Sequence, residues 1–465
     1  MELGEIGIRR FSSTSQIQTP EQMPSRFIDR FIRLKTTYWN RGFAIVLLTF
    51  IGLKILQIEY LSLFLSLSEL YEENYSPYCG YGMLIGFIPG GVLATVYPAH
   101  NIFGISFIVY SIYHFMEVMN TVFFLNADLH HFFQFCMGMT MAMAYSAPHR
   151  VCTFWIPLKK QSLRYVPILL YSIFNTQLCY YIINSFLQNI NGLIVLFRLA
   201  WFILWLYVVN RDRSQSLFRP CRDSNNVPRS SGISIISLKR SIILDIPWKS
   251  FCTSLPVIAL VISYICNTNA IYIQESYFAK SIKSSDQPLR NHSSIMLLPI
   301  FVVLELFPEI TVCISVTNVR KLLSCSICIA MGVEFLLEAF KVNTFLLLDK
   351  NELFKFIYSE MKYFHIFGIG LNHLDIAPKY ASIIFGFQST IFHISRIYLF
   401  DISEILLIAD GRDDFRIHIL MAVIYISVAV FYAIFGSAEI QPWGEDKTIK
   451  DNQQNMHDEV ILPAV

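Results

Sequence analysis

Charged residues are scarce in this chain of 465 residues: Asp, Glu, Lys and Arg together make up 15% of it, whereas 54% is hydrophobic. No soluble globular class has this composition, because apolar runs of about 20 residues recur along the whole length. Backbone polar groups in hydrocarbon need internal partners, so these runs are expected to be helices. The predicted fold class is therefore an all-α polytopic membrane protein.

Several other features are missing. The net charge of +2 is too small to favour a nucleic-acid partner. A cleavable signal peptide is not visible, because the first apolar run starts near Phe43 behind a long polar arm. The one C-x-x-C, formed by Cys325 and Cys328, begins an apolar run, which favours inert buried thiols over a metal or redox site. We therefore expect no cofactor and no metal.

The apolar runs form two sets of six, about 12 membrane spans in all, on either side of a basic stretch. The first set covers 43–64, 80–98, 103–125, 131–150, 163–187 and 191–210, and the second covers 251–273, 294–316, 323–342, 352–371, 378–400 and 416–437. Two six-helix pseudo-repeats are predicted. The expected divisions are a basic N-terminal arm (1–42), a first bundle (43–210), a central loop (211–250), a second bundle (251–437) and a C-terminal tail (438–465).

Basic residues concentrate before the first run and in the central loop, which predicts that both termini are cytosolic. The end of the arm, RFIDRFIRLK, fits either an amphipathic helix on the membrane surface or ordinary flanking charge. Two sequons, at Asn74 and Asn291, then fall in loops on the lumenal or extracellular side. Both are predicted to be glycosylation sites.

The most informative stretch runs from Gly368 to Phe387 and reads GIGLNHLDIAPKYASIIFGF. An apolar run ends in a polar cluster, and another begins after Pro378, which cannot continue a helix. This pattern predicts two spanning helices joined by a short turn on the aqueous side. The polar side chains Asn372, His373 and Asp375 are expected to bond the carbonyls left open at the helix end.

The same stretch resembles a signature of the organic-anion branch of the major facilitator superfamily, which holds the vesicular glutamate transporters, sialin and the sodium/phosphate cotransporters. The IPGG within residues 82–104 and FYAIFGSAEIQPW at 431–443 extend the resemblance over most of residues 41–443. It implies the major facilitator fold and alternating-access transport of glutamate- or phosphate-like anions. The implied coupling ion is a proton, sodium or chloride, and the implied partners are the lipid bilayer and a small anionic solute. A monomer in a synaptic or secretory vesicle membrane, or in the plasma membrane, is expected.

An anion in a low-dielectric site needs a cation, so each cation inside a span is a candidate. Lys54 falls where the family has a substrate-site arginine, although pairing with Glu59 or snorkelling would also explain it. Arg198 would be a replacement anion clamp, a salt-bridge partner or an interfacial residue. The resemblance adds two tyrosines associated with the substrate site, Tyr145 and Tyr272.

Three titratable residues are candidates for ion coupling. His114 and Glu117 stand at i,i+3 in the third span, where they would form a proton-handling pair or a packing pair. Glu334 matches a glutamate that the family keeps, and its other interpretation is an interior pair partner.

The chain also departs from the family. Gln134 and Asn267 fall on two family arginines, and Met141 falls on a family glutamate. These losses leave open a second hypothesis, a transport-inactive relative that acts as a membrane scaffold or regulator. A membrane enzyme using His130 and His131 is disfavoured, because two adjacent histidines do not build a metal site.

Overall fold

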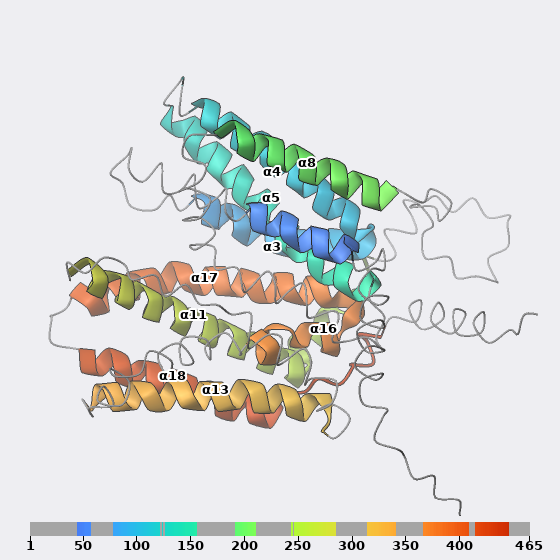
Figure 1. Ribbon diagram of the computed structural model, residues 1–465. Coiled ribbons are helices and arrows are strands. Elements are labelled where there is room, and N and C mark those ends of the chain that lie inside the picture. The colour runs from blue at the N-terminus through green and yellow to red at the C-terminus, as the bar shows by residue number, and fades with distance from the viewer. Residues whose placement is uncertain are drawn as a thin grey trace, which may run out of the picture.

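The computed structural model describes residues 44–56, 78–120, 123, 126–155, 191–210, 243–244, 246–284, 314–340, 366–408 and 414–445. Within these ranges the secondary structure is helical and includes no strand. The helices lie roughly side by side in two groups, one above the other in Figure 1. The fold class predicted from composition, an all-α polytopic membrane protein, is confirmed.

The first group comes from the N-terminal part of the chain and fills the upper part of Figure 1. It consists of the helix Ala44–Leu56, α3 (Tyr78–Val96), α4 (Ala99–Met119), α5 (Ala127–Trp155) and α8 (Asn191–Asn210). Packing of α5 against both α3 and α4 forms the centre of this group. Aromatic rings join α8 to α4, with the Phe107 and Trp201 ring centroids 4.3 Å apart.

The second group fills the lower part of Figure 1. Its helices are α10 (Trp248–Thr253), α11 (Leu255–Ser284), α13 (Val316–Ala339), α17 (Ala381–Ile408) and α18 (Asp414–Phe435). Three short elements precede α17: the π-helix η5 (Ile366–Gly370), α16 (Asn372–Ile376) and the 3-10 turn η6 (Pro378–Tyr380). α13 packs along α18, while α11 contacts both α17 and α18.

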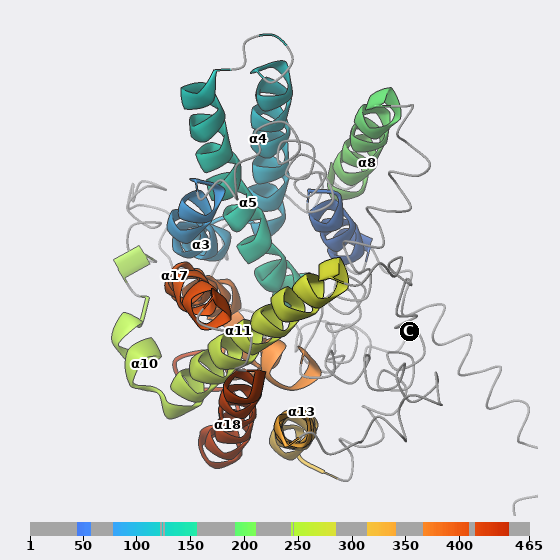
Figure 2. The same cartoon turned by 90° about the vertical axis from the view of Figure 1, so that its left-hand side faces the viewer.

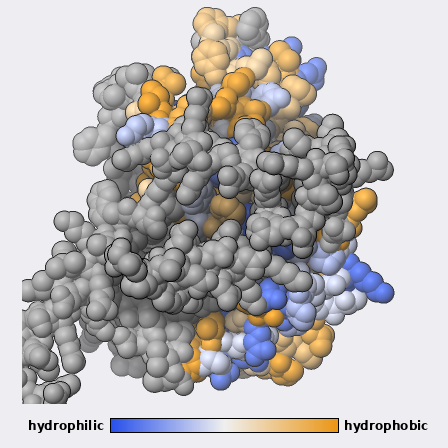
Figure 3. Space-filling model, turned by 90° about the vertical axis from the view of Figure 1, so that its right-hand side faces the viewer, coloured by the Kyte–Doolittle hydropathy of each residue, from blue (hydrophilic) through white to orange (hydrophobic). Residues whose placement is uncertain are grey.

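Three of the described helices are long and apolar enough to cross a membrane: Tyr78–Val96, Ala99–Met119 and His418–Phe435. Many large apolar side chains point outward, among them Phe115 (61% exposed) and Ile203 (64% exposed). Figure 3, viewed from the end that carries α16, shows hydrophobic surface at the upper and lower margins. Such outward-facing apolar surface is expected of helices that contact lipid.

The two groups meet where α17 lies against α3 and α5 (Figures 1 and 2). The main chains come close here because glycine faces backbone on both sides. A Cβ added at Gly91 would lie 2.5 Å from the Ser382 carbonyl oxygen, and one at Gly386 would lie 2.5 Å from the Phe87 carbonyl oxygen. Small residues allow this approach between membrane helices, where van der Waals packing drives association.

Helices occupy nine of the expected spans, at least in part. The span expected at 163–187 lies outside the described residues, as do nearly all of 294–316 and most of 352–371. The N-terminal arm, nearly all of the central loop and most of the C-terminal tail also lie outside them. The proposed division into bundles and loops therefore stays a prediction.

Candidate functional site

The polar residues of the signature segment are buried within the protein; the side of the membrane on which the segment lies stays a prediction. Asn372 and His373 are 0% exposed, and Asp375 is 2% exposed. His373 bonds the Gly370 backbone at the end of η5, as predicted, whereas the bonds found for Asn372 and Asp375 go to other parts of the protein. Each one reaches a different part of the protein, so α16 is a junction between several helices.

Asp375 forms a buried ion pair with Arg320, near the start of α13. Both Nε and one terminal nitrogen of Arg320 donate to the same carboxylate oxygen of Asp375, at 2.9 and 2.7 Å. Arg320 is only 1% exposed and is among the largest fully buried side chains. Because the pair is desolvated on both sides, removal of either partner would leave an uncompensated buried charge.

Asn372 connects α16 to the end of α18. Its amide nitrogen donates to the Tyr432 hydroxyl and to the Ser437 carbonyl, both at 2.8 Å. The backbone N–H of Gln441 donates to the Ile376 carbonyl at 2.8 Å. The segment that follows α18 therefore packs on α16, although the sequence predicted only local carbonyl bonding.

His373 and Pro378 contact the first group of helices, through the end of α5. Nε2 of His373 lies 2.8 Å from Nδ1 of His149, and Arg150 donates to the Pro378 carbonyl at 3.1 Å. All four residues are buried. We call these two interactions the α16-end contact, because they join the two groups at the end of the molecule that carries α16.

The chemistry of the α16-end contact is that of neutral imidazoles. His373 lies in the connection between two spans, where burial and then the charge of Arg320 lower its pKa to about 3. A neutral pair can share one proton across the 2.8 Å separation, with one ring donating and the other accepting. Phe385 stacks on His149, with ring centroids 3.8 Å apart, and further encloses the pair.

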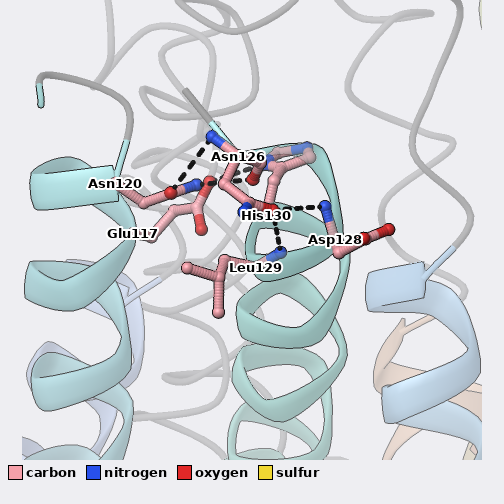
Figure 4. Close-up of polar contacts among 6 residues, drawn as sticks. All are labelled: Glu117, Asn120, Asn126, Asp128, Leu129 and His130. Carbon is pink, nitrogen blue, oxygen red and sulfur yellow. Dashed lines mark hydrogen bonds and ion pairs between the residues drawn. The ribbon is translucent and has the colours of Figure 1, made fainter. Parts of the chain in front are cut away.

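A second polar cluster lies at the opposite end, between α4 and α5 (Figure 4). Glu117 is fully buried and pairs with His130. Beside them, the Asn120 side chain donates to the Asn126 carbonyl at 3.0 Å and accepts from the Asn126 N–H at 3.3 Å. The predicted partner of Glu117 was His114; a nitrogen of Arg198 instead lies 3.2 Å from Nδ1 of His114.

The two candidate cations occupy different surroundings. Arg198 is half-buried between α8 and α4, and Figure 1 places these helices on the side of the first group away from α17. Lys54 is half-buried in the helix Ala44–Leu56. The structure therefore does not bring Arg198 to the meeting of the two groups.

The remaining predicted site residues lie on several elements. Tyr145 is half-buried on α5, with its ring 6.5 Å from that of Phe87, and Glu334 is half-buried on α13. Tyr272 lies on α11, but its side chain is outside the described part, as are both Asn74 and Asn291. Three uncharged residues fall where the family resemblance implies charged ones, and all three are buried: Gln134, Met141 and Asn267.

Sequence reasoning missed most residues that contact the signature. His149 and Arg150 were not singled out, although a histidine and an arginine at the end of an apolar run are a signal for an interfacial role. Arg320 was not singled out either. Its carboxylate partner, Asp375, lies 55 residues away, a separation that no local pattern reveals.

Taken together, the helices, their apolar outer faces and the buried polar junction define an integral membrane protein. The chain is similar to vesicular glutamate transporter 2 of Homo sapiens, with 23% identity over 397 residues that cover 80% of this chain and 66% of that protein. It is also similar to the probable vesicular glutamate transporter eat-4 of Caenorhabditis elegans, with 25% identity over 392 residues that cover 79% of this chain and 65% of that protein. These similarities confirm the predicted resemblance to the organic-anion branch of the major facilitator superfamily, from which the chain diverges widely.

No protein-family model matches the sequence. Among solved structures, a major facilitator superfamily transporter, FucP, in the outward conformation is similar at 12% identity with a TM-score of 0.49, covering 86% of this chain and all of that one. The chain spans slightly less than two thirds of the length of the two glutamate transporters. Those relatives are named as transporters, in agreement with the prediction that the chain is not an enzyme.

The ion pair between Arg320 and Asp375 gives a direct test of the junction. Asp375→Asn is expected to lower the free energy of unfolding by about 3–5 kcal/mol, because it leaves the Arg320 charge buried and unpaired. The double variant Arg320→Met/Asp375→Leu should recover most of this loss, since neither charge remains. The measurement is thermal unfolding in detergent. Equal stability of Asp375→Asn and the unmodified protein would contradict the proposed role of the pair.

Proposed function

We propose that this protein is a secondary active transporter of small organic or inorganic anions that works by alternating access. The observation that carries the proposal is the α16-end contact, in which two groups of helices are joined by side-chain interactions that can separate. Similarity to vesicular glutamate transporters over four fifths of the chain supports the same conclusion. Transport of this kind needs two such groups and an end that opens and closes.

In this proposal the α16-end contact is a gate, closed in the conformation described. Its interactions are few: one imidazole pair and one guanidinium–carbonyl bond. No ion pair between the groups is found there in the described residues. A contact of this strength suits an equilibrium between conformations that differ by a few kcal/mol.

The substrate class follows from the relatives, whose names specify glutamate. Lys54 is the proposed cation of the substrate site, because it lies in a predicted spanning segment. The other candidate cation, Arg198, contacts His114. Tyr145 and Tyr272 are proposed to contact the substrate, as the family resemblance implies. Glutamate-like or phosphate-like anions are the first to test.

Proton coupling is proposed to involve the Glu117–His130 pair rather than Glu117 with His114. A buried carboxylate and an imidazole in contact can exchange a proton without leaving a lone charge in the interior. Glu334 remains a second coupling candidate, on α13. Sodium and chloride are alternative coupling ions.

The proposed location is a vesicle membrane or the plasma membrane, with both termini in the cytosol. In that orientation the α16 end faces the cytosol, and the Glu117–His130 pair lies toward the lumen or the cell exterior. The sequons at Asn74 and Asn291 would lie on the same side as this pair. A monomer is proposed.

An alternative function, a transport-inactive scaffold or regulator, is favoured by one observation. Gln134, Met141 and Asn267 are buried yet uncharged, where the family resemblance implies charge. If Lys54 does not compensate, an anion would meet too little positive potential to leave water.

The test of the proposed function is uptake into proteoliposomes, screened with glutamate, phosphate, urate and sialic acid under imposed potential and pH gradients. Lys54→Ala is expected to lower uptake of a transported anion at least about tenfold, because the anion loses its cation. Arg198→Ala is the matched control and should leave the KM unchanged while lowering stability. Failure of all four solutes would favour the inactive alternative.

The gate is tested by labelling a cysteine placed behind it. Ser382 is fully buried at the meeting of α3 and α17, so Ser382→Cys should react slowly with N-ethylmaleimide. Adding Arg150→Ala removes the bond to the Pro378 carbonyl and is expected to raise the labelling rate about tenfold, by favouring the open state. Labelled peptides are identified by mass spectrometry.

Thr317→Ala serves as the control for the labelling experiment. It removes a bond at the same end but within the second group, where Thr317 accepts from the Ala438 N–H at 3.0 Å. Labelling that rises equally in both variants would indicate general loosening, and the gate would have to be abandoned.

The coupling pair is tested with Glu117→Gln. If the pair carries the coupling proton, this variant should keep solute exchange at equal pH but lose accumulation driven by a pH gradient. Asn120→Ala disturbs the same loop without removing a titratable group, so it should retain gradient-driven uptake. Accumulation that survives in Glu117→Gln would rule out this role.

A further inference from the structure

Buried polar side chains gather where α11 faces α17, away from both polar clusters described above. Two contacts join the helices there. Asn269 donates to the Ser395 hydroxyl at 2.8 Å, and the ring centroids of Tyr264 and Phe392 lie 6.3 Å apart. The buried polar residues of this stretch are Ser263, Asn267, Asn269, Gln388 and Ser389.

Two amides in this stretch lack partners. Gln388 is 0% exposed, and neither its amide oxygen nor its amide nitrogen has a hydrogen-bond partner. Asn267 is 2% exposed, and its amide nitrogen has none. The Ser263 hydroxyl and the Asn269 amide oxygen are also unpartnered. Within the described residues this is a concentration of unmet donors and acceptors on two facing helices.

A cluster of buried polar atoms without hydrogen-bond partners lowers the stability of a membrane protein. A buried donor or acceptor without a partner bears its full desolvation penalty, and hydrocarbon supplies no water to relieve it. A side chain as long as glutamine could be replaced there by leucine, with similar volume and no unmet group. Several unmet groups together on facing helices offer hydrogen bonds to a polar ligand.

The surroundings limit the chemistry of that ligand. Residues 255–269 of α11 and 381–395 of α17 include no Asp, Glu, Lys or Arg. Amides offer neutral donors and acceptors, and they cannot balance a carboxylate charge in a desolvated site. Lys54, proposed above as the substrate cation, supplies one positive charge, which is enough for one carboxylate.

We propose that the amides of Gln388 and Asn267 are solute-contacting groups, and that they select a solute of net charge −1 over a dicarboxylate of net charge −2. This inference rests on the proposed function, because Lys54 is assigned there to the carboxylate. The amides would bond the neutral end of the solute from α11 and α17. Among residues 255–269 and 381–395, a second carboxylate would face amides and no cation.

The probes are succinate and succinamate, which share a skeleton and differ by one carboxylate replaced with an amide. The full-length protein in proteoliposomes is expected to take up succinamate at least about tenfold faster than succinate at low concentration. The reason is that the second carboxylate of succinate would be desolvated without a charged partner. Gln388→Leu should lower succinamate uptake about tenfold. Gln441→Leu, which removes an amide at the α16 end, is the matched control and should leave uptake unchanged.

Thermal unfolding separates a binding role from a structural one. Gln388→Leu removes unmet polar atoms, so its Tm without solute should equal or exceed that of the unmodified protein. The increase in Tm that succinamate causes in the unmodified protein should disappear in this variant. A structural amide would behave in the opposite way, with a lower Tm and a retained response. Asn267→Ala provides a second variant for the same comparison if Gln388→Leu does not fold.

The outcomes distinguish the two proposals. Uptake of glutamate or phosphate that Gln388→Leu and Asn267→Ala leave unchanged would overturn the amide site and keep the transporter. Faster uptake of succinate than of succinamate would overturn the selectivity. A Gln388-dependent increase in Tm with succinamate, without uptake of any solute, would support the site and overturn transport.

Discussion

Hydrocarbon offers no hydrogen bonds, so each polar group of a membrane-embedded chain must be satisfied by the chain itself or by what it binds. The α16 region illustrates the first solution. Asn372, His373 and Asp375 are fully or almost fully buried, and each bonds a different element. The rest of the second group depends on this arrangement, because α13, α16 and the segment after α18 are joined there. The stretch around Gln388 illustrates the second solution.

Three of the described arginines are used for structure. Arg320 pairs with Asp375, Arg150 bonds a main-chain carbonyl, and Arg198 contacts His114. All three interactions occur within or between helices at places where a guanidinium can reach a fixed acceptor. The chain has therefore kept buried cations while the positions matched to family arginines carry neutral side chains.

Composition and periodicity were sufficient to predict the helical class and the approximate positions of the spans, because burial in lipid imposes length and apolarity on every helix. The signature around Asn372 was also visible in the sequence, but its environment was not. A polar run between two apolar runs normally indicates an aqueous turn, and only the contacts of Arg320, His149 and Tyr432 explain its burial. Glu117 was recognised as a candidate, whereas its partner His130 lies on the next helix, beyond the reach of an i,i+3 rule.

The close approach of α3 and α17 has a mechanical consequence. At Gly386 the main chain of α17 lies close to the Phe87 carbonyl of α3, and the Phe87 ring also contacts Phe385 and His393. Small residues allow this close packing between membrane helices. We infer that this crossing is the fulcrum of the molecule, a place where the groups stay in touch while their ends move apart.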